Sequence, residues 1–193
     1  MRRVFVGVTG ASGSIYAGYF LKHLSKMDDI EIHLTITDDG LKNIIYENNG
    51  ITTINDFLKH YDVETEKVVL HDYKNMAAPV SSGSFKVSDY IVIPASMGCV
   101  GRIAGGISSN LVERCADVAL KERRRLIVVF REAPLNSIHL ENLLKLSRNG
   151  AITIPASPAF YHNPETIEDL ILFIIGKIFD IMNIDTDLFK RWS

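Results

Sequence analysis

The sequence predicts an α/β protein with a doubly wound, mostly parallel sheet and helices on both faces. Predicted strands alternate with predicted helices along the chain. Several strands are apolar at every position rather than at alternate positions, which is typical of strands buried on both faces. Small and polar residues follow directly after these strands, at the edge of the sheet where such folds bind ligands.

The first strand and the turn after it carry the clearest functional pattern. Residues 4–8 are expected to form a buried strand, and residues 9–14 form a glycine-rich turn before a helix over 14–26. Small residues let a backbone approach an anion, and the N–H groups of a helix N-terminus attract one, so we interpret this stretch as a phosphate cradle. The glycine spacing matches neither the dinucleotide fingerprint nor the P-loop, and a tight turn that binds nothing stays an alternative.

The rest of the first half contains shorter elements. We expect a central strand over 31–37, a helix capped by Asp38 that carries Leu41, Ile44 and Ile45, a short helix over 52–61 and a peripheral strand over 67–71. The segment 73–86 is rich in Gly, Pro and small polar residues, so it is expected to be irregular. A loop of this length favours a binding or lid function, with disorder as the alternative.

The second half repeats the alternation of strands and helices. We expect strands over 89–94, 126–130 and 151–155. A small-residue helical region is expected over 100–109, followed by a helix over 110–120 with Leu111, Cys115, Val118 and Ala119 inward. We also expect a helix over 138–148 capped by Ser137, and a long helix to about residue 183 opened by Asn163 and Pro164. Repeats and linkers are not apparent, so we expect residues 1–193 to form one domain.

Composition excludes several classes of protein. Hydrophobic residues make up 47% and charged residues 23% of the 193 residues, and the formal net charge is −2, which argues against a nucleic-acid partner. The basic residues Arg123 to Arg125 are expected to form the solvated end of a helix. No carboxylate cluster suggests a metal site.

The cysteines and apolar stretches indicate a cytoplasmic protein. Cys99 and Cys115 have neither metal-ligand spacing nor a disulfide framework, which fits a reducing compartment. The N-terminal apolar stretch is short and interrupted by glycines, so a signal peptide is not expected. The apolar run 170–175 is too short to span a membrane.

Residues that follow the predicted strands point to a single site. They are Ser12, Thr37, Ser96, Arg131, Glu132 and the segment 157–161. Arg131 comes directly after five apolar residues, so we expect it to be paired or to bind an anion. Glu132 could protonate a leaving phosphate oxygen or only pair with an arginine, and both alternatives stay open. Neither a nucleophile elbow nor a Ser/His/Asp set is present, and His139 and His162 are expected to be structural.

At this point the chain resembles a known family, the flavin prenyltransferases of the UbiX type. The matching stretches are Val8–Gly13, Ser82–Ser84, Asn110–Arg114, Ala116–Arg124, Arg131–Leu135, Ser137–Asn142, Pro158–His162 and the final Arg191–Trp192. The resemblance implies a Rossmann- or flavodoxin-like flavoprotein fold and the metal-independent transfer of a dimethylallyl group from dimethylallyl phosphate to reduced FMN. It also implies a dodecameric homo-oligomer with flavin at subunit interfaces, and a UbiD-type decarboxylase that receives the prenylated FMN.

The resemblance implies roles for individual residues. The FMN contacts would be Gly10, Ala11, Ser12, Thr37, Ser96, Met97, Gly98, Cys99 and Arg131, with Ser12 as a proton relay near the flavin N5. The dimethylallyl phosphate contacts would be Arg114, Lys121, Arg131, Tyr161, Lys177 and Trp192. Glu132 would be the acid, Glu47 a second carboxylate near the site, and Lys121 a catalytic cation. The tail 184–193 would close the site through Trp192.

Two positions depart from the family pattern. Lys177 stands where arginine is usual, so one phosphate contact becomes a point charge without the guanidinium fork. Asn75 stands where the family can carry a tryptophan against the prenyl group, and Tyr73 could replace that wall. Two other functions stay open: an FMN-dependent cysteine decarboxylase of the same fold, and a carrier subunit that binds FMN without catalysis.

Overall fold

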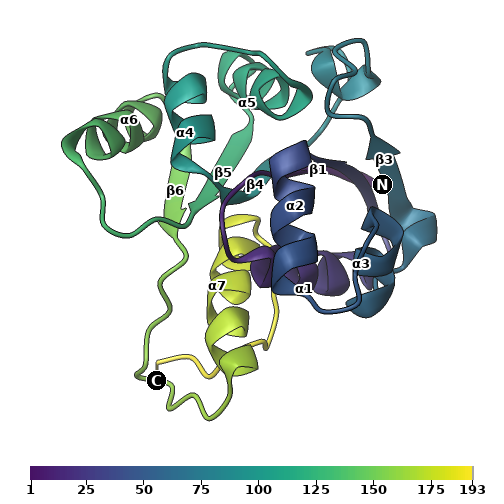
Figure 1. Cartoon of the computed structure of the whole chain (residues 1–193), viewed down its shortest axis with the longest axis vertical. Coiled ribbons are helices and arrows are strands. Elements are labelled where there is room, and N and C mark those ends of the chain that lie inside the picture. The colour runs from purple at the N-terminus through teal and green to yellow at the C-terminus, as the bar shows by residue number, and fades with distance from the viewer. Residues whose placement is uncertain (193) are drawn as a thin grey trace.

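The computed structural model describes residues 1–192 as a six-stranded parallel sheet with helices on both faces (Figure 1), which confirms the predicted fold class. The strands are β1 (Arg2–Val8), β2 (Ile30–Ile36), β3 (Val68–His71), β4 (Asp89–Ala95), β5 (Arg125–Phe130) and β6 (Ile152–Pro155). The helices are α1 (Ser14–Ser25), α2 (Asp38–Glu47), α3 (Ile54–His60), α4 (Met97–Ala104), α5 (Leu111–Lys121), α6 (Ser137–Arg148) and α7 (Ile167–Ile181), with short 3₁₀ turns at Thr65–Lys67 and Pro79–Ser81.

The strand order β3-β2-β1-β4-β5-β6 reverses direction between β1 and β4. The chain moves outward from β1 to β2 and β3, and then returns to the other side of β1 to lay down β4, β5 and β6. At such a point the connections that follow two neighbouring strands run to opposite faces of the sheet. A crevice therefore opens beyond the carboxyl ends of these two strands. The topology therefore places the predicted ligand edge between the ends of β1 and β4.

Two apolar cores cover the two faces of the sheet. Val4 and Val6 of β1 point into the core formed with α1, α3 and α7, whereas Phe5 points into the core formed with α4, α5 and α6. All three side chains are fully buried, as continuous apolar strands predict. The inward-facing residues predicted for α5 (Leu111, Cys115, Val118 and Ala119) are buried in the second core, which confirms that prediction.

Three helices begin at a different capping residue from the one the sequence predicts. Thr37 rather than Asp38 caps α2, Asn136 rather than Ser137 caps α6, and Thr166 rather than Asn163 caps α7. Each true cap has extended backbone and accepts an N–H from the residue three positions later. Asn163 instead has a left-handed backbone with φ of 55°, which a cap does not adopt.

The small-residue helix also begins earlier than predicted. Ser96 caps α4 by accepting the Cys99 N–H at 3.3 Å, so the helix starts at residue 97 and not at residue 100. It ends at Ala104, before Gly105 and Gly106. The segment 96–99 is therefore a helix cap and first turn that aims N–H groups at the ligand edge.

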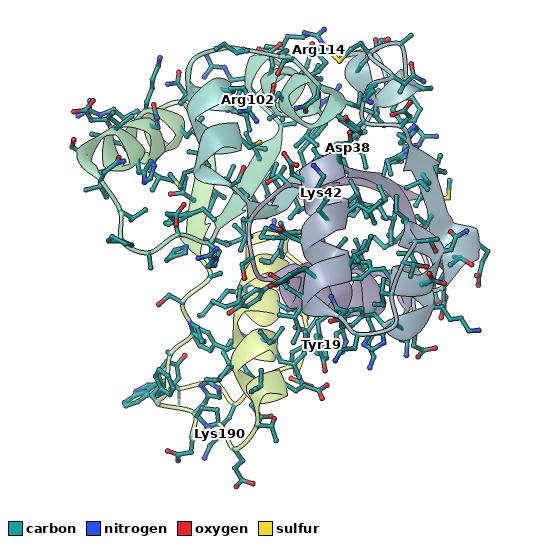
Figure 2. All side chains as sticks on the ribbon, in the orientation of Figure 1. Tyr19, Asp38, Lys42, Arg102, Arg114 and Lys190 are labelled. Atoms are coloured by element: carbon teal, nitrogen blue, oxygen red, sulfur yellow. The ribbon has the colours of Figure 1, made fainter. Side chains whose placement is uncertain are left out.

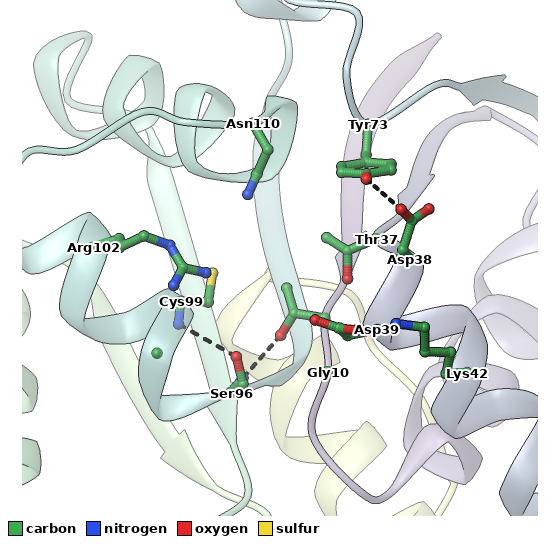
Figure 3. A pocket seen from close by; sticks show the side chains of 12 residues that line it. Gly10, Thr37, Asp38, Asp39, Lys42, Tyr73, Ser96, Cys99, Arg102 and Asn110 are labelled. Carbon is green, nitrogen blue, oxygen red and sulfur yellow. Dashed lines mark hydrogen bonds and ion pairs between the residues drawn. The ribbon is translucent and has the colours of Figure 1, made fainter.

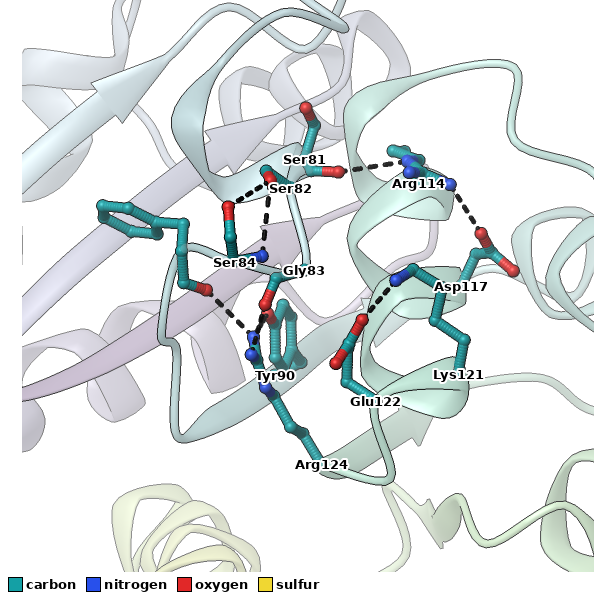
Figure 4. A network of polar contacts seen from close by, with 11 residues as sticks. Ser81, Ser82, Gly83, Ser84, Tyr90, Arg114, Asp117, Lys121, Glu122 and Arg124 are labelled. Atoms are coloured by element: carbon teal, nitrogen blue, oxygen red, sulfur yellow. Dashed lines mark hydrogen bonds and ion pairs between the residues drawn. The ribbon is translucent and has the colours of Figure 1, made fainter.

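The basic run does not form a solvated helix end, and only Arg123 is exposed as expected. Arg124 donates to the carbonyl oxygens of Gly83 and Phe85 and to the Tyr90 hydroxyl, so it anchors the 73–88 segment to the sheet (Figure 4). Arg125 lies in β5 and pairs with Asp89. The prediction was wrong for these two residues because their acceptors are distant in sequence.

Among residues 1–192, no helix has the length and apolar character needed to cross a membrane. The same residues contain no group of three or more His, Cys, Asp or Glu side chains placed to hold a metal ion.

A buried carboxylate joins the amino ends of three segments. Asp89 at the start of β4 is fully buried and accepts from Arg2 at 2.7 and 2.9 Å and from Arg125 at 2.5 Å. Arg2 also donates to the Met182 carbonyl oxygen at 2.6 Å, just after α7. Removing one member of a buried ion pair leaves its partners without compensation, which is costly.

We therefore expect Asp89→Ala to lower the free energy of unfolding by about 3 kcal/mol, because two arginines lose their shared carboxylate. Urea denaturation followed by circular dichroism measures this loss. The control is Asp62→Asn, which breaks an exposed pair with Lys26 at 2.7 Å. It should cost less than about 1 kcal/mol, and an equal effect of both substitutions would contradict the role of Asp89.

Candidate active site

A cavity of about 360 Å³ lies at the predicted edge of the sheet, beyond the carboxyl ends of β1, β2 and β4 (Figure 3). Its lining residues are Thr9, Gly10, Thr37, Asp38, Asp39, Lys42, Tyr73, Ser96, Gly98, Cys99, Arg102 and Asn110. Five of the predicted FMN contacts are in this set: Gly10, Thr37, Ser96, Gly98 and Cys99. The structure thus brings together residues that are up to 89 positions apart in sequence.

The Thr9 side chain connects the two sides of this cavity. Its hydroxyl donates to the Pro94 carbonyl oxygen at 2.9 Å and accepts the Ser96 N–H at 2.8 Å. Thr9 is almost completely buried. The turn after β1 and the start of α4 are therefore held at a fixed separation, although sequence reasoning did not single out Thr9.

Close packing explains the glycine at position 10. A Cβ atom there would lie 2.7 Å from the Cβ of Asp39 at the start of α2. Ala11 and Met97 are buried, and Ser12 is exposed at the tip of the turn. Any contact that Ala11 or Met97 makes with a ligand must therefore come mainly from the backbone.

Cys99 lines the cavity but is not an activated nucleophile. Burial raises the pKa of its thiol to about 12, so the thiolate is scarce at neutral pH. Cys115 is also buried, and burial raises its thiol pKa as well. The two thiols behave as core residues.

The predicted phosphate cradle at the start of α1 already holds an anion. Glu47, at the end of α2, accepts the N–H groups of Gly13 at 2.9 Å and Ser14 at 2.7 Å. Burial alone would raise the pKa of Glu47, but hydrogen bonds from Ser14, Ser12 and Gly13 outweigh that effect and lower it. In this chain a carboxylate of the protein occupies the donors that the sequence predicts for a phosphate.

Arg131 and Glu132 follow β5, next to this turn. The Arg131 Nε donates to the Ser12 carbonyl oxygen at 3.1 Å, so the arginine lies against the glycine-rich turn. Glu132 accepts only the N–H of its neighbour Ala133, at 3.1 Å, within the described chain. Within residues 1–192 Glu132 forms no ion pair, so pairing with an arginine does not account for it.

The C-terminal tail packs on an aromatic cluster. The rings of Tyr161 and Trp192 pack edge-on with 5.4 Å between their centroids, and the centroids of Tyr161 and Phe173 of α7 are 5.8 Å apart. The Lys177 Nζ lies 5.7 Å from the centre of the Phe173 ring. A second hollow of about 190 Å³ borders this cluster and is lined by Tyr161, His162, Lys190, Arg191 and Trp192.

The two cations predicted on α5 lie apart from both hollows. Arg114 pairs with Asp117 at 2.8 Å and donates to the Ser81 carbonyl oxygen, while Lys121 pairs with Glu122 (Figure 4). Figure 2 shows Arg114 and Lys190 at opposite ends of the molecule. The set predicted to bind one phosphate is therefore split within a single chain, between α5 and the tail region.

The Asn75 side chain accepts the Ala77 N–H at 3.1 Å within its own loop, and Asn75 does not line the main cavity. Tyr73 lines the main cavity, and its hydroxyl donates to Asp38 at 2.6 Å (Figure 3). Sequence reasoning also missed Arg102 and Asn110, which line the same cavity. The available signal for Arg102 was a lone charge in a helix of small and apolar residues.

Comparisons with known proteins agree with this arrangement. The profile of the Flavoprotein family matches residues 1–179. The flavin prenyltransferase UbiX of Methanocaldococcus jannaschii is 44% identical over 99% of this chain and 98% of its own length. The enzyme of the same name from Halalkalibacterium halodurans is 45% identical over 97% of this chain and 92% of its own length.

Solved structures add fold similarity at full length. A crystal structure of AnUbiX (PadA1) in complex with FMN and dimethylallyl pyrophosphate has a TM-score of 0.91 at 39% identity, covering 100% of this chain and 97% of that chain. A dodecameric FMN-dependent Ubix-like decarboxylase from Escherichia coli O157:H7 has a TM-score of 0.91 at 36% identity, covering 99% of each chain.

More distant structures share the fold alone. The FMN-dependent cysteine decarboxylase TvaF has a TM-score of 0.59 at only 14% identity. It therefore lends the cysteine decarboxylase alternative no support beyond a common architecture. From the family profile and the full-length relatives, the chain belongs to the Flavoprotein family and, within it, to the flavin prenyltransferases.

Proposed function

We propose that this chain transfers a dimethylallyl group from dimethylallyl phosphate to reduced FMN, and that the product passes to a UbiD-type decarboxylase. The observation that carries the proposal is the cavity at the switch point, which is lined by five of the nine FMN positions that the family implies. AnUbiX, with the same fold at 39% identity, binds FMN and dimethylallyl pyrophosphate. We also infer a cytoplasmic location, since both cysteines are free and buried.

The cavity has the chemistry that a flavin mononucleotide needs. Hydroxyls of Thr37 and Ser96 and the peptide groups of Gly10 border it. Reduced FMN supplies the nucleophilic N5 and C6 positions when bound. In the transfer, the allylic carbon–oxygen bond would break, its electron pair would leave with the phosphate, and the allyl carbon would bond to N5, which loses its proton. In the ring closure, the prenyl double bond would take up a proton at one carbon, and its other carbon would bond to C6, which loses its proton.

Glu132 is the proposed acid for the leaving phosphate. It is half-buried next to Arg131, and it is engaged only by its neighbour's N–H among the described residues. Arg131 would hold negative charge close to the flavin turn, where its Nε is already fixed on the Ser12 carbonyl oxygen. Fixed cations and a positioned acid stabilise developing charge without reorganisation.

We propose that the remaining cations come from a neighbouring copy. Arg114 and Lys121 lie on α5, away from the tail cluster, and the Escherichia coli relative is dodecameric. Ile138, Leu140 and Leu144 of α6 are 64%, 55% and 50% exposed, which is unusual for large apolar residues on one helix and fits a contact between copies.

The tail from residue 184 is proposed to close the prenyl pocket. Arg191 holds it through two hydrogen bonds to Asp180, at 2.7 and 3.0 Å, and a third to the Thr186 carbonyl oxygen. Trp192 thereby meets the ring of Tyr161. Aromatic faces exclude water and shield developing allylic charge.

Glu132→Gln should block alkylation while leaving FMN bound, because the amide cannot supply the proton. Mixing each protein with reduced FMN and dimethylallyl phosphate should give a flavin heavier by one prenyl unit with the wild type. The rate should fall at least about 100-fold in the variant. Mass spectrometry of the extracted flavin measures both.

Glu66→Gln, in the exposed 3₁₀ turn Thr65–Lys67, is the matched control and should behave as the wild type. Unaltered flavin from the wild-type protein would favour the carrier alternative. Loss of FMN from the Glu132→Gln protein would instead show that Glu132 is structural.

A shared site predicts complementation between inactive variants. Lys121→Ala and Glu132→Gln should each be inactive alone, because each removes one half of the site. Mixed oligomers, formed by co-expression, should regain roughly a quarter of the wild-type activity, the share of interfaces that combine two intact halves by chance. Absence of recovery in verified mixed oligomers would place both groups in one chain.

Arg191→Gln should loosen the tail and raise KM for dimethylallyl phosphate about 5- to 10-fold, since substrate binding must then order the tail. FMN affinity should not change. Steady-state kinetics and flavin fluorescence separate the two effects. Asp180→Asn removes the same contact from the other side and should match it, whereas an unaltered KM in both variants would exclude closure by the tail.

A further inference from the structure

Arg102 is a cation of the main cavity that neither the family pattern nor the proposed reaction uses. It lies in the last turn of α4 and reaches back over the helix toward Cys99 and the space below Asn110 (Figure 3). Its side chain is 44% exposed, and only its Nε has a hydrogen-bond partner within residues 1–192. Both terminal nitrogens are thus available to a ligand.

A buried carboxylate fixes this arginine in place. Glu113 of α5 is fully buried and accepts the Arg102 Nε at 2.5 Å. Three further donors hold Glu113 itself: the Ser109 N–H and hydroxyl at 2.8 and 2.6 Å, and the Asn110 side-chain amide at 2.8 Å. Burial alone would raise the pKa of Glu113, but the hydrogen bonds from Ser109 and Arg102 lower it, so the carboxylate stays charged.

The α2 side of the cavity repels an anion. The first turn of α2, in the lining, carries Asp38 and Asp39. The start of α1 lies outside the lining, and Glu47 already accepts its N–H groups. Lys42 is the other cation of the lining, and it pairs with Asp39 at 2.9 Å. The α2 side therefore disfavours the negative end of a ligand.

The α4 wall has the opposite character. Its first turn contains no acidic residue, and the N–H groups of Met97 and Gly98 have no acceptor within the described chain. A Cβ atom at position 98 would lie 3.4 Å from the Arg102 Nη1, so glycine keeps the space between the helix start and the guanidinium open. Backbone donors and a guanidinium fork together match a phosphate monoester.

We propose that Arg102, positioned by Glu113, binds the phosphate of flavin mononucleotide and so makes this cavity select FMN over unphosphorylated riboflavin. The proposal rests on the proposed function, because it takes the flavin to be the occupant of the cavity. It assigns Arg102 to binding and Glu113 to positioning. It also places the phosphate at the start of α4 and not at the glycine-rich turn before α1.

The experiment compares FMN with riboflavin, which differ only in the phosphate. Arg102→Gln should raise the Kd of FMN about 10- to 100-fold, the range expected for a lost charge-assisted bidentate contact. The Kd of riboflavin should change less than about 2-fold, since its ring and ribityl chain do not touch the guanidinium. Flavin fluorescence titration on the full chain measures all four values.

Arg102→Gln leaves the buried Glu113 without its cation, so a second variant separates binding from folding. Arg102→Gln combined with Glu113→Gln is neutral and keeps hydrogen-bonding groups at both positions. It should fold and still bind FMN as weakly as the single variant. Recovery of wild-type FMN affinity in the double variant would overturn the proposal, because Arg102 would then serve only to neutralise Glu113.

Arg148→Gln is the matched control, since it removes an exposed arginine at the end of α6, outside the cavity. It should leave both flavin affinities unchanged. If the wild-type protein prenylates FMN and the Arg102→Gln variant binds FMN with unchanged affinity, the role of Arg102 is overturned. The proposed function then remains intact. A wild-type protein that binds FMN no more tightly than riboflavin would also overturn it.

Discussion

The hydrogen bonds of the Thr9 side chain hold the candidate site together, because they join the two halves of the sheet at the point where the chain connections separate. After β1 the chain turns toward α1 on one face, and after β4 it turns toward α4 on the other. Because these two connections diverge, a cavity forms between them, and the two segments that border it do not pack directly against each other there. The Thr9 hydroxyl bonds both Pro94 and Ser96, so the walls keep a constant spacing without a side chain filling the space between them.

Charge is distributed unevenly around this cavity, and the helix starts explain how. Three helices begin at its rim, and each presents unpaired N–H groups that favour an anion. The protein supplies its own carboxylates to two of them, through Glu47 at α1 and through Asp38 and Asp39 at α2. The first turn of α4 has no acidic residue, and its N–H groups lie next to the Arg102 guanidinium. The cavity thus has a carboxylate-rich side and a cationic side, which orients any ligand that carries a single charged end.

Sequence patterns predicted the strands and their common edge well, because runs of apolar residues and strand ends are local signals. Capping residues were less predictable. Asp38, Ser137 and Asn163 are all chemically suitable caps, and the backbone conformation decides between each of them and a neighbour. Arg124 and Arg125 were misjudged for a different reason. Their acceptors at Gly83 and Asp89 lie 41 and 36 residues earlier, and only the folded chain brings them close.

The site itself could be predicted only in part, for a related physical reason. The residues at the ends of β1, β2 and β4 meet because every parallel sheet brings such ends to one edge. Glu47 and Arg102 take their roles from contacts across helices, which no spacing along the chain encodes. The cations on α5 show most clearly what sequence patterns cannot predict. Arg114 and Lys121 are paired with Asp117 and Glu122, and the sequence alone does not reveal these pairs.

Those α5 ion pairs also constrain how a shared site would assemble. A phosphate from a neighbouring copy's pocket would have to compete with the Glu122 carboxylate for the Lys121 ammonium. Both groups are about half exposed or less, so their mutual attraction is modest in the isolated chain. Burial between copies would strengthen every charge interaction there, and a dianionic phosphate would attract the ammonium more strongly than a single carboxylate does. Association and substrate binding would therefore favour each other.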